Sequence, residues 1–160
     1  MIIRTATLDD LNEIHNVEAE CFSESEAASK KEFEERLIYY PNHFWLIFED
    51  EKLVAFIDGF VSDEKDLRDE MYENASLHDE NGSWQMIFGV NTLPEYRKQG
   101  YATKLINQII DCAQKENRSG VVLTCKEHLL GYYSKFGFVD EGISESQHGG
   151  VVWHQMRLTF

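Results

Sequence analysis

The sequence predicts an α/β fold in a single domain that spans residues 1–160. Two patterns lead to this prediction. Short apolar and aromatic runs of strand length alternate with longer segments whose apolar residues recur every three or four positions, as on one face of a helix. Hydrophobic residues make up 42% of the 160 residues, which is enough for one buried core. The element order β-α-α-β-β-β-α-β-α-β-β favours a mixed, mostly antiparallel central sheet of about seven strands flanked by helices.

The chain opens with a short strand and two helices. Residues 2–3 begin the strand, and Thr7 is a suitable N-cap for a helix that continues to Cys21. Ser29 and Glu32 have the spacing of a capping box, which predicts the start of the second helix.

The middle of the chain is predicted to hold three strands around an acidic segment. Two aromatic-rich runs, Phe44–Phe48 and Leu53–Val61, form a β-hairpin. Segment 63–80 follows, in which eight acidic residues outnumber two basic ones. It is either a solvated helix-and-loop surface or a binding surface for a basic partner. A turn at 81–82 leads to a strand over Trp84–Asn91.

The last part of the chain is predicted to hold a buried strand at Val121–Cys125, a short helix at Leu129–Lys135 and two further strands. Residues 148–150 separate these two strands, and the second one covers Val151–Leu158. We expect residues 152–158 to form an exposed sheet edge, through which the chain could form a homodimer.

The stretch Arg97-Lys98-Gln99-Gly100-Tyr101-Ala102-Thr103 follows the apolar strand Met86–Val90 and opens a helix. A helix N-terminus carries unpaired N–H groups and a partial positive charge, which favour a phosphate group. Gly100 lets an anion approach the backbone, and Arg97 and Lys98 add positive charge. An ordinary strand-loop-helix connection with a turn glycine would give the same local pattern. The apolar positions that predict the helix are Ala102, Leu105, Ile106, Ile109, Ile110 and Ala113.

The composition excludes several classes of function. A net charge of −14 repels nucleic acid and fits a cationic partner, for example an amine. No apolar run approaches the roughly 20 residues of a membrane span, and no signal-peptide pattern is found, so we expect a cytoplasmic protein that binds no membrane. Three cysteines without metal-ligand spacing fit a reducing compartment and predict no metal site.

Two motifs give the chain a family resemblance. The pattern Arg97-x-x-Gly100-x-Ala102, preceded by Leu93-Pro94-Glu95-Tyr96, resembles the acetyl-CoA pyrophosphate loop of the GNAT family of N-acetyltransferases. The run Tyr133-Ser134-Lys135-Phe136-Gly137-Phe138 resembles the second signature of that family, a tyrosine followed by a Gly-Phe pair. The element order also matches. The resemblance therefore covers nearly the whole chain and implies the acyl-CoA N-acyltransferase fold.

Further stretches resemble the arylalkylamine (serotonin) N-acetyltransferase branch of that family. They are Leu53-Val54-Ala55-Phe56-Ile57, Leu77-His78-Asp79 and Cys125-Lys126-Glu127. That branch carries two histidines on the strand before the phosphate loop, where they relay a proton from the amine. Met86 and Phe88 stand at the matching positions and cannot take a proton.

The resemblance implies an enzyme that uses acetyl-CoA as cosubstrate and needs no metal. It would pass the acetyl group directly to a primary amine in a ternary complex, and we expect this amine to be small and cationic. A backbone N–H of the strand Val90-Asn91-Thr92 would stabilise the oxyanion. Tyr133 would give a proton to the departing thiolate. The residues implied to bind the cofactor are Val90, Asn91, Thr92, Arg97, Lys98, Gln99, Gly100, Tyr101, Ala102 and Thr103.

The sequence leaves the acceptor of the amine proton open. Histidine titrates near neutral pH, which makes His78, His148 and His154 candidates. Glu70 and Asp58 are acidic alternatives, and a chain of water molecules along backbone carbonyls is another.

Other mechanisms and functions are also open. Cys125 could form a covalent acetyl-enzyme, although no histidine has a suitable spacing from it. Lys126 stands where many members of the family carry an asparagine that contacts the cofactor. The alternatives to an enzyme are a catalytically silent CoA-binding sensor and an interaction module that binds a basic protein through segment 63–80.

Overall fold

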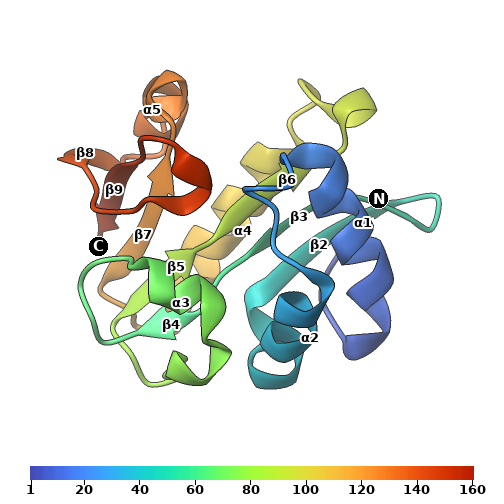
Figure 1. Cartoon of the computed structure of the whole chain (residues 1–160), viewed down its shortest axis with the longest axis horizontal. Coiled ribbons are helices and arrows are strands. Elements are labelled where there is room, and N and C mark those ends of the chain that lie inside the picture. Colours follow the sequence, from blue (N-terminus) through green and yellow to red (C-terminus); the bar gives the residue numbers. More distant parts are fainter.

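Nine strands and five α-helices make up the computed structural model, which describes residues 1–160 (Figure 1). The helices are α1 (Leu11–Cys21), α2 (Lys30–Tyr39), α3 (Asp69–Glu73), α4 (Tyr101–Lys115) and α5 (Leu130–Ser134). The strands are β1 (Ile2–Thr5), β2 (Phe44–Glu49), β3 (Lys52–Asp58), β4 (Val61–Ser62), β5 (Trp84–Ile87), β6 (Gly89–Thr92), β7 (Gly120–Cys125), β8 (Val139–Ile143) and β9 (His154–Thr159).

The strands form one sheet in the order β1-β2-β3-β6 and a second in the order β4-β5-β7-β9-β8. Only β5 and β7 are parallel, and all the other neighbours are antiparallel. The predicted α/β fold with mixed, mostly antiparallel pairing is confirmed. The expected single sheet is divided in two, because the predicted strands 53–61 and 84–91 are each interrupted.

These two interruptions bend the chain. Gly59 and Phe60 separate β3 from β4, and Phe88 separates β5 from β6. A side chain at residue 59 would begin 1.8 Å from the carbonyl oxygen of Met86, so this close approach requires glycine. Strand β6 stays paired with β3, whereas β5 pairs with β7. Strands β6 and β7 therefore diverge, as Figure 1 shows.

Helices cover both faces of the sheets. In Figure 1, α1, α2 and α3 lie in front and α4 lies behind. Strand β2 alternates between these layers: Phe44, Leu46 and Phe48 share a core cluster with α1 and α2, and Trp45 and Ile47 share one with α4. The buried residues of α4 belong to the predicted apolar stripe: Leu105, Ile106, Ile109 and Ala113.

The start of α2 follows its predicted signal, and the start of α1 does not. The Glu32 N–H donates to Ser29 Oγ at 3.1 Å, and the Ser29 N–H donates to the Glu32 carboxylate at 3.0 Å, which completes the capping box of α2. Thr7 was expected to cap the first helix, but it caps a 3₁₀ turn over Leu8–Asp10 instead, and Asp10 is the N-cap of α1. No helix of the protein is both long and apolar enough to cross a membrane.

Two expectations about the end of the chain are wrong. Strand β9 begins at His154 rather than at Val151, because residues 148–150 form a 3₁₀ turn and the chain stays irregular to Trp153. Strand β9 is also no edge, since it pairs with β7 on one side and with β8 on the other. Residues 152–158 therefore offer no free edge to a second subunit.

Candidate functional site

A cleft of about 880 Å³ opens where β6 and β7 diverge, and we call it the central cleft. Strand β6 and the start of α4 form one wall. The end of β7 and helix α5 form the opposite wall. The division of the sheet, rather than any single side chain, thus creates the space.

The loop before α4 forms the end of the central cleft that is suited to an anion. None of the backbone N–H groups from Lys98 to Thr103 donates a hydrogen bond within the protein. Gly100 has a φ of 87° and open space where a side chain would begin, so a ligand can approach the backbone. Arg97 lines the same end. Because α4 is 15 residues long, its dipole adds to these groups, and the arrangement suits a pyrophosphate.

Strand β6 turns alternate backbone groups toward the central cleft. The Leu93 N–H donates to the Val54 carbonyl at 2.9 Å, and in an antiparallel pair every second residue makes such bonds. The N–H of Asn91 therefore faces β3, and the N–H groups of Val90 and Thr92 face the cleft. The Thr92 carbonyl also accepts a hydrogen bond from outside the sheet, which agrees with this alternation.

Eight of the ten residues predicted to bind the cofactor line the central cleft. Gln99 does not, because its side-chain amide donates to the Glu95 carbonyl at 3.2 Å. Asn91 does not either, because it is buried with only 1% of its surface exposed. The eight residues are Val90, Thr92, Arg97, Lys98, Gly100, Tyr101, Ala102 and Thr103.

Tyr133 lies on α5 and lines the central cleft opposite β6. Burial raises the pKa of Tyr133, which keeps the phenol protonated at neutral pH. A protonated phenol can donate to a sulfur atom in the cleft. The neighbouring Tyr132 differs, because its hydroxyl lies 3.0 Å from Thr103 Oγ1 and forms a hydrogen bond there.

Cys125 and Lys126 also line the central cleft. Burial raises the pKa of the Cys125 thiol to about 11, so thiolate is scarce at neutral pH and an acetyl-enzyme is disfavoured. Lys126 forms an ion pair with Glu26 at 2.8 Å. This pair lies at the border of a second cavity.

The second cavity, of about 420 Å³, adjoins the central cleft, and we call it the acidic pocket. Arg36 is the one lysine or arginine in its lining. Phe88 and Gly89 belong to both linings, so the cavities meet at the bend between β5 and β6. Six carboxylate side chains line the acidic pocket: Glu18, Glu26, Glu32, Asp58, Asp69 and Glu73.

Three buried charged side chains lie at the floor of the acidic pocket. Arg36 Nη1 donates to Asp58 Oδ2 at 2.8 Å, and Glu18 Oε2 accepts the Ala28 N–H at 2.8 Å. Glu18 Oε1, Asp58 Oδ1 and the side-chain amide of Asn91 have no hydrogen-bond partner. Because an unpaired buried polar atom is costly, we expect these atoms to bind a ligand or water.

The two carboxylates at this floor share one guanidinium. Burial, together with the charge of Asp58, raises the pKa of Glu18 to about 7. Burial raises the pKa of Asp58 too, and its contact with Arg36 opposes that shift. Since Asp58 holds the direct ion pair, Glu18 is the carboxyl group that titrates near neutral pH.

The residues predicted as candidate proton acceptors lie at different places in the structure. Asp58 and His148 line the acidic pocket, and His148 Nε2 already contacts a backbone carbonyl at 2.6 Å. Glu70 lines a different groove, between α3 and β8. His154 pairs with a carboxylate of β8 at 3.2 Å. His78 lies outside both cavities, in the cluster described next.

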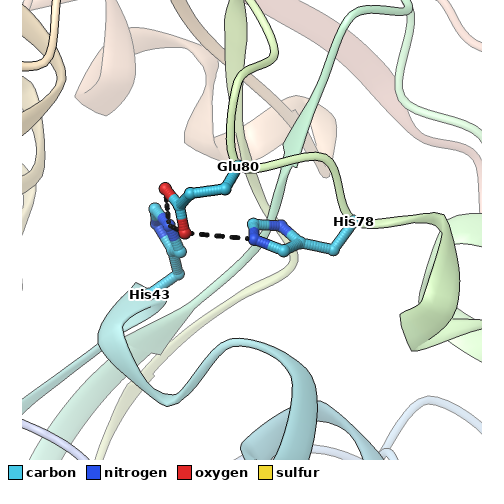
Figure 2. A group of neighbouring side chains, drawn as sticks. All are labelled: His43, His78 and Glu80. Carbon is cyan, nitrogen blue, oxygen red and sulfur yellow. Dashed lines mark hydrogen bonds and ion pairs between the residues drawn. The ribbon is translucent and has the colours of Figure 1, made fainter.

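A polar cluster holds the end of segment 63–80 against the sheet. Figure 2 shows His43 and His78 directed at the carboxylate of Glu80, with distances of 3.0 and 3.2 Å from the two Nε2 atoms. Arg118 Nη2 donates to the same carboxylate at 2.8 Å. Burial opposes ionisation of Glu80, but the charge of His43 and the surrounding hydrogen bonds lower its pKa to about 2.

Two histidines and a glutamate are also a possible ligand set for a metal ion, and their donor atoms lie within 4.8 Å of one another. The hydrogen bonds argue against such a site. The Val61 N–H donates to His78 Nδ1 at 3.0 Å, so the proton of the neutral ring is on Nε2, the atom that faces Glu80. Without a lone pair there, His78 cannot ligate a metal in this arrangement. The cluster is therefore an anchor for the chain.

Segment 63–80 does not form one acidic surface. Asp69 and Glu73 of α3 line the acidic pocket, whereas Glu70 lines the separate groove. The end of the segment is held by the cluster around Glu80. The segment thus contributes in part to the candidate site and in part to folding.

Glu18 is the candidate residue that the sequence reasoning missed. It follows Val17 and lies four residues after Ile14, both of which are buried in the core. The sequence feature that could have identified Glu18 is a carboxylate within the apolar stripe of an amphipathic helix.

Diverging strands beside a helix N-terminus with unpaired N–H groups are what the acyl-CoA N-acyltransferase fold leads one to expect. The sequence profile of the Acetyltransferase (GNAT) family matches residues 9–138. The chain belongs to this family, whose acetyltransferases are acyl-CoA-dependent transferases. This match covers the family as a whole, and the arylalkylamine branch stays a prediction. A search among curated proteins found no match.

Solved structures share the fold at low sequence identity. The loading GNATL domain of CurA from Lyngbya majuscula is 17% identical with a TM-score of 0.85, and the match covers 99% of this chain and 96% of that one. The GphF GNAT-like decarboxylase in complex with isobutyryl-CoA is 19% identical with a TM-score of 0.84 and 99% coverage of both chains. The PaiA N-acetyltransferase of Thermoplasma acidophilum in complex with coenzyme A is 17% identical with a TM-score of 0.73, covering 99% and 98%.

Proposed function

We propose that the protein transfers the acetyl group of acetyl-CoA directly to the nitrogen of a small cationic primary amine, with both substrates bound together. The observation that carries the proposal is the meeting of two differently charged cavities at Gly89. Unpaired N–H groups and Arg97 in the central cleft suit a pyrophosphate, and carboxylates in the acidic pocket suit an ammonium group. We expect the reaction to take place in the cytoplasm.

The chemistry follows from the groups around the junction. The neutral amine attacks the thioester carbon, and the Val90 N–H that faces the central cleft stabilises the oxyanion. The carbon–sulfur bond then breaks, and Tyr133 gives its proton to the thiolate. Binding both reactants at adjoining cavities removes much of the entropic cost of their encounter.

The side chains that line the acidic pocket favour a narrower class of substrate, an amine that carries an aromatic ring. Phe22, Tyr72, Phe88 and Trp153 line it together with the carboxylates. An aromatic ring attached to the amine would contact these side chains while its ammonium group met the acids. This arrangement fits the resemblance to the arylalkylamine branch.

One of the similar structures is a decarboxylase, which raises a second reaction class. A decarboxylase must accept an acyl group that carries its own carboxylate. Six carboxylates beside the junction would repel such a substrate, and only one arginine would attract it. The charge of the acidic pocket therefore favours a cationic acceptor over an anionic acyl chain.

The test is release of free thiol from acetyl-CoA with a panel of arylalkylamines, polyamines, amino acids and a peptide with a free N-terminus. We expect turnover with at least one cationic amine and none with a neutral alcohol of the same shape. Binding of CoA without thiol release on the whole panel would favour a silent sensor. If neither CoA nor acetyl-CoA raises the melting temperature, an interaction module that uses segment 63–80 becomes the better explanation.

A further inference from the structure

We propose that Glu18 takes the proton from the substrate ammonium group, and that Glu18 and Asp58 together form the ammonium subsite beside Gly89. This inference rests on the proposed function and adds the residue that its motifs do not supply. Met86 and Phe88 occupy the positions of the expected histidines, and neither side chain can accept a proton.

The geometry around Gly89 carries the inference. A methyl group placed on Gly89 would lie 3.3 Å from Asn91 Nδ2, 3.4 Å from Asp58 Oδ1 and 3.5 Å from Glu18 Oε1. These are the same three groups that lack hydrogen-bond partners. Three unpaired polar atoms thus lie beside Gly89, and both carboxylate residues line the acidic pocket. An ammonium nitrogen in this pocket, at van der Waals distance from Gly89, could donate to both carboxylate oxygens.

This subsite lies beside the reacting end of the central cleft. Gly89 lines both cavities, and the next residue, Val90, presents its N–H to the central cleft. An amine held at Gly89 is therefore adjacent to the place where the thioester carbonyl would accept a hydrogen bond from Val90. The ammonium subsite at Gly89 and the oxyanion donor at Val90 therefore lie at neighbouring positions of β6, whereas the proton acceptor, Glu18, comes from α1.

The groups that face Glu18 come from every element packed around it. Asp58 of β3 disfavours its charge, and Arg36 of α2 favours it. The Ala28 N–H and the side-chain amide of Asn91 are dipoles that favour the negative charge of Glu18. Cys21, on the same helix as Glu18, is the further titratable group near it. Burial is the largest influence, and together these groups give a pKa of about 7. A carboxylate of ordinary pKa would be a much weaker base toward an ammonium group near 10.4.

The protons balance as follows. The ammonium group gives one proton to Glu18, and the neutral amine attacks the thioester carbon to form the new carbon–nitrogen bond. The carbon–sulfur bond breaks, and the thiolate takes a proton from Tyr133, which regains one from the amide nitrogen as it is formed. Glu18 finally releases its proton to water. The net products are the acetylated amine, free CoA thiol and one proton.

The test compares Glu18→Gln with Glu20→Gln, an exposed glutamate two residues further along α1. With an amine that the wild type acetylates, we expect kcat to fall 10²- to 10³-fold in Glu18→Gln and to stay near wild type in Glu20→Gln. We also expect the rise of kcat/KM through about pH 7 to disappear in Glu18→Gln. A wild type that acetylates no amine contradicts the proposed function, whereas an active Glu18→Gln contradicts only this inference.

A second nucleophile separates a proton acceptor from a residue that merely supports the fold. An O-alkyl hydroxylamine is already neutral at pH 7 and needs no base before attack. We expect the loss of kcat in Glu18→Gln to shrink at least tenfold with this nucleophile, and an equal loss with both nucleophiles would overturn the inference.

Gly89→Ala supplies an independent variant. Its methyl group would lie against Asp58 and Glu18, so the KM for the amine should rise while the KM for acetyl-CoA stays within twofold. An unchanged KM for the amine would place the ammonium elsewhere.

Discussion

The two cavities that meet at Gly89 are built in different ways. The anion end of the central cleft consists of consecutive backbone N–H groups in residues 98–103, from one loop and one helix. The floor of the acidic pocket consists of the side chains of Glu18, Arg36 and Asp58, from three elements far apart in the chain. A short segment is sufficient to bind a phosphate. A perturbed carboxylate needs burial and charged neighbours, which only distant segments bring together.

The largest expected effect concerns a side chain of the central cleft. Tyr133→Phe should lower turnover by about 10²- to 10⁴-fold, because it removes the proton donor, while CoA binding is retained. Thiol release and the CoA-induced shift in melting temperature measure the two effects. The matched variant Tyr132→Phe should weaken the binding free energy of CoA by only about 1 kcal/mol, because it removes a hydrogen bond to Thr103. Equal losses in both variants would mean that packing in α5, rather than the phenol, matters.

The second prediction concerns the free energy of unfolding and tests the acidic pocket. The pKa of Glu18 is raised in the folded state, so its charged form is disfavoured and stability falls as pH rises from about 4.5 to about 7. Glu18→Gln removes this penalty and should stabilise the protein by up to about 3 kcal/mol at pH 8, with little effect at pH 4. Denaturant unfolding at both pH values measures it, with Glu20→Gln as control. A Glu18→Gln variant that is less stable at pH 8 would contradict the raised pKa.

A smaller effect is expected at the backbone of the central cleft. Gly100→Ala should weaken CoA binding about tenfold, because the methyl group limits the approach of a phosphate to the N–H groups. Gly142→Ala is the control: Gly142 has a φ of 97° and equally open space, but it lies outside the central cleft. Both variants should lose about 1–2 kcal/mol of stability from the left-handed backbone. Isothermal titration with CoA measures binding separately from the loss of stability. Equal CoA affinities of the two variants would exclude Gly100 from the phosphate contact.

The smallest effect is expected at the border between the cavities. The ion pair of Lys126 with Glu26 is partly exposed, so Lys126→Met should change stability by less than about 1 kcal/mol. It also frees a carboxylate of the acidic pocket, and the KM for a cationic amine should fall up to about fivefold at low salt. The gain should vanish in high salt, where such charges are screened. If Lys126→Met lowered the KM for a neutral nucleophile by the same factor, the charge of the acidic pocket would not be the cause.

Most of the fold could be predicted because its signals are local. The capping box at Ser29, the apolar stripe of α4 and the glycine before it each lie within a few residues, and the structure has helices where they indicated. The sheet edge at residues 152–158 was predicted wrongly for the opposite reason. Nothing within β9 shows that β7 and β8 will occupy both of its sides.

By itself, the sequence determined most of the order of the elements and the position of Tyr133 on a short helix, and it predicted that the loop before α4 binds an anion, since each depends on neighbouring residues. Tertiary structure alone decided the rest of the site. Strands β6 and β7 diverge because pairing partners change at Phe88, and Glu18 acquires its raised pKa because Asp58 and Arg36 pack beside it. Burial and electrostatic interactions depend on distances in space, and chain order does not encode these distances directly.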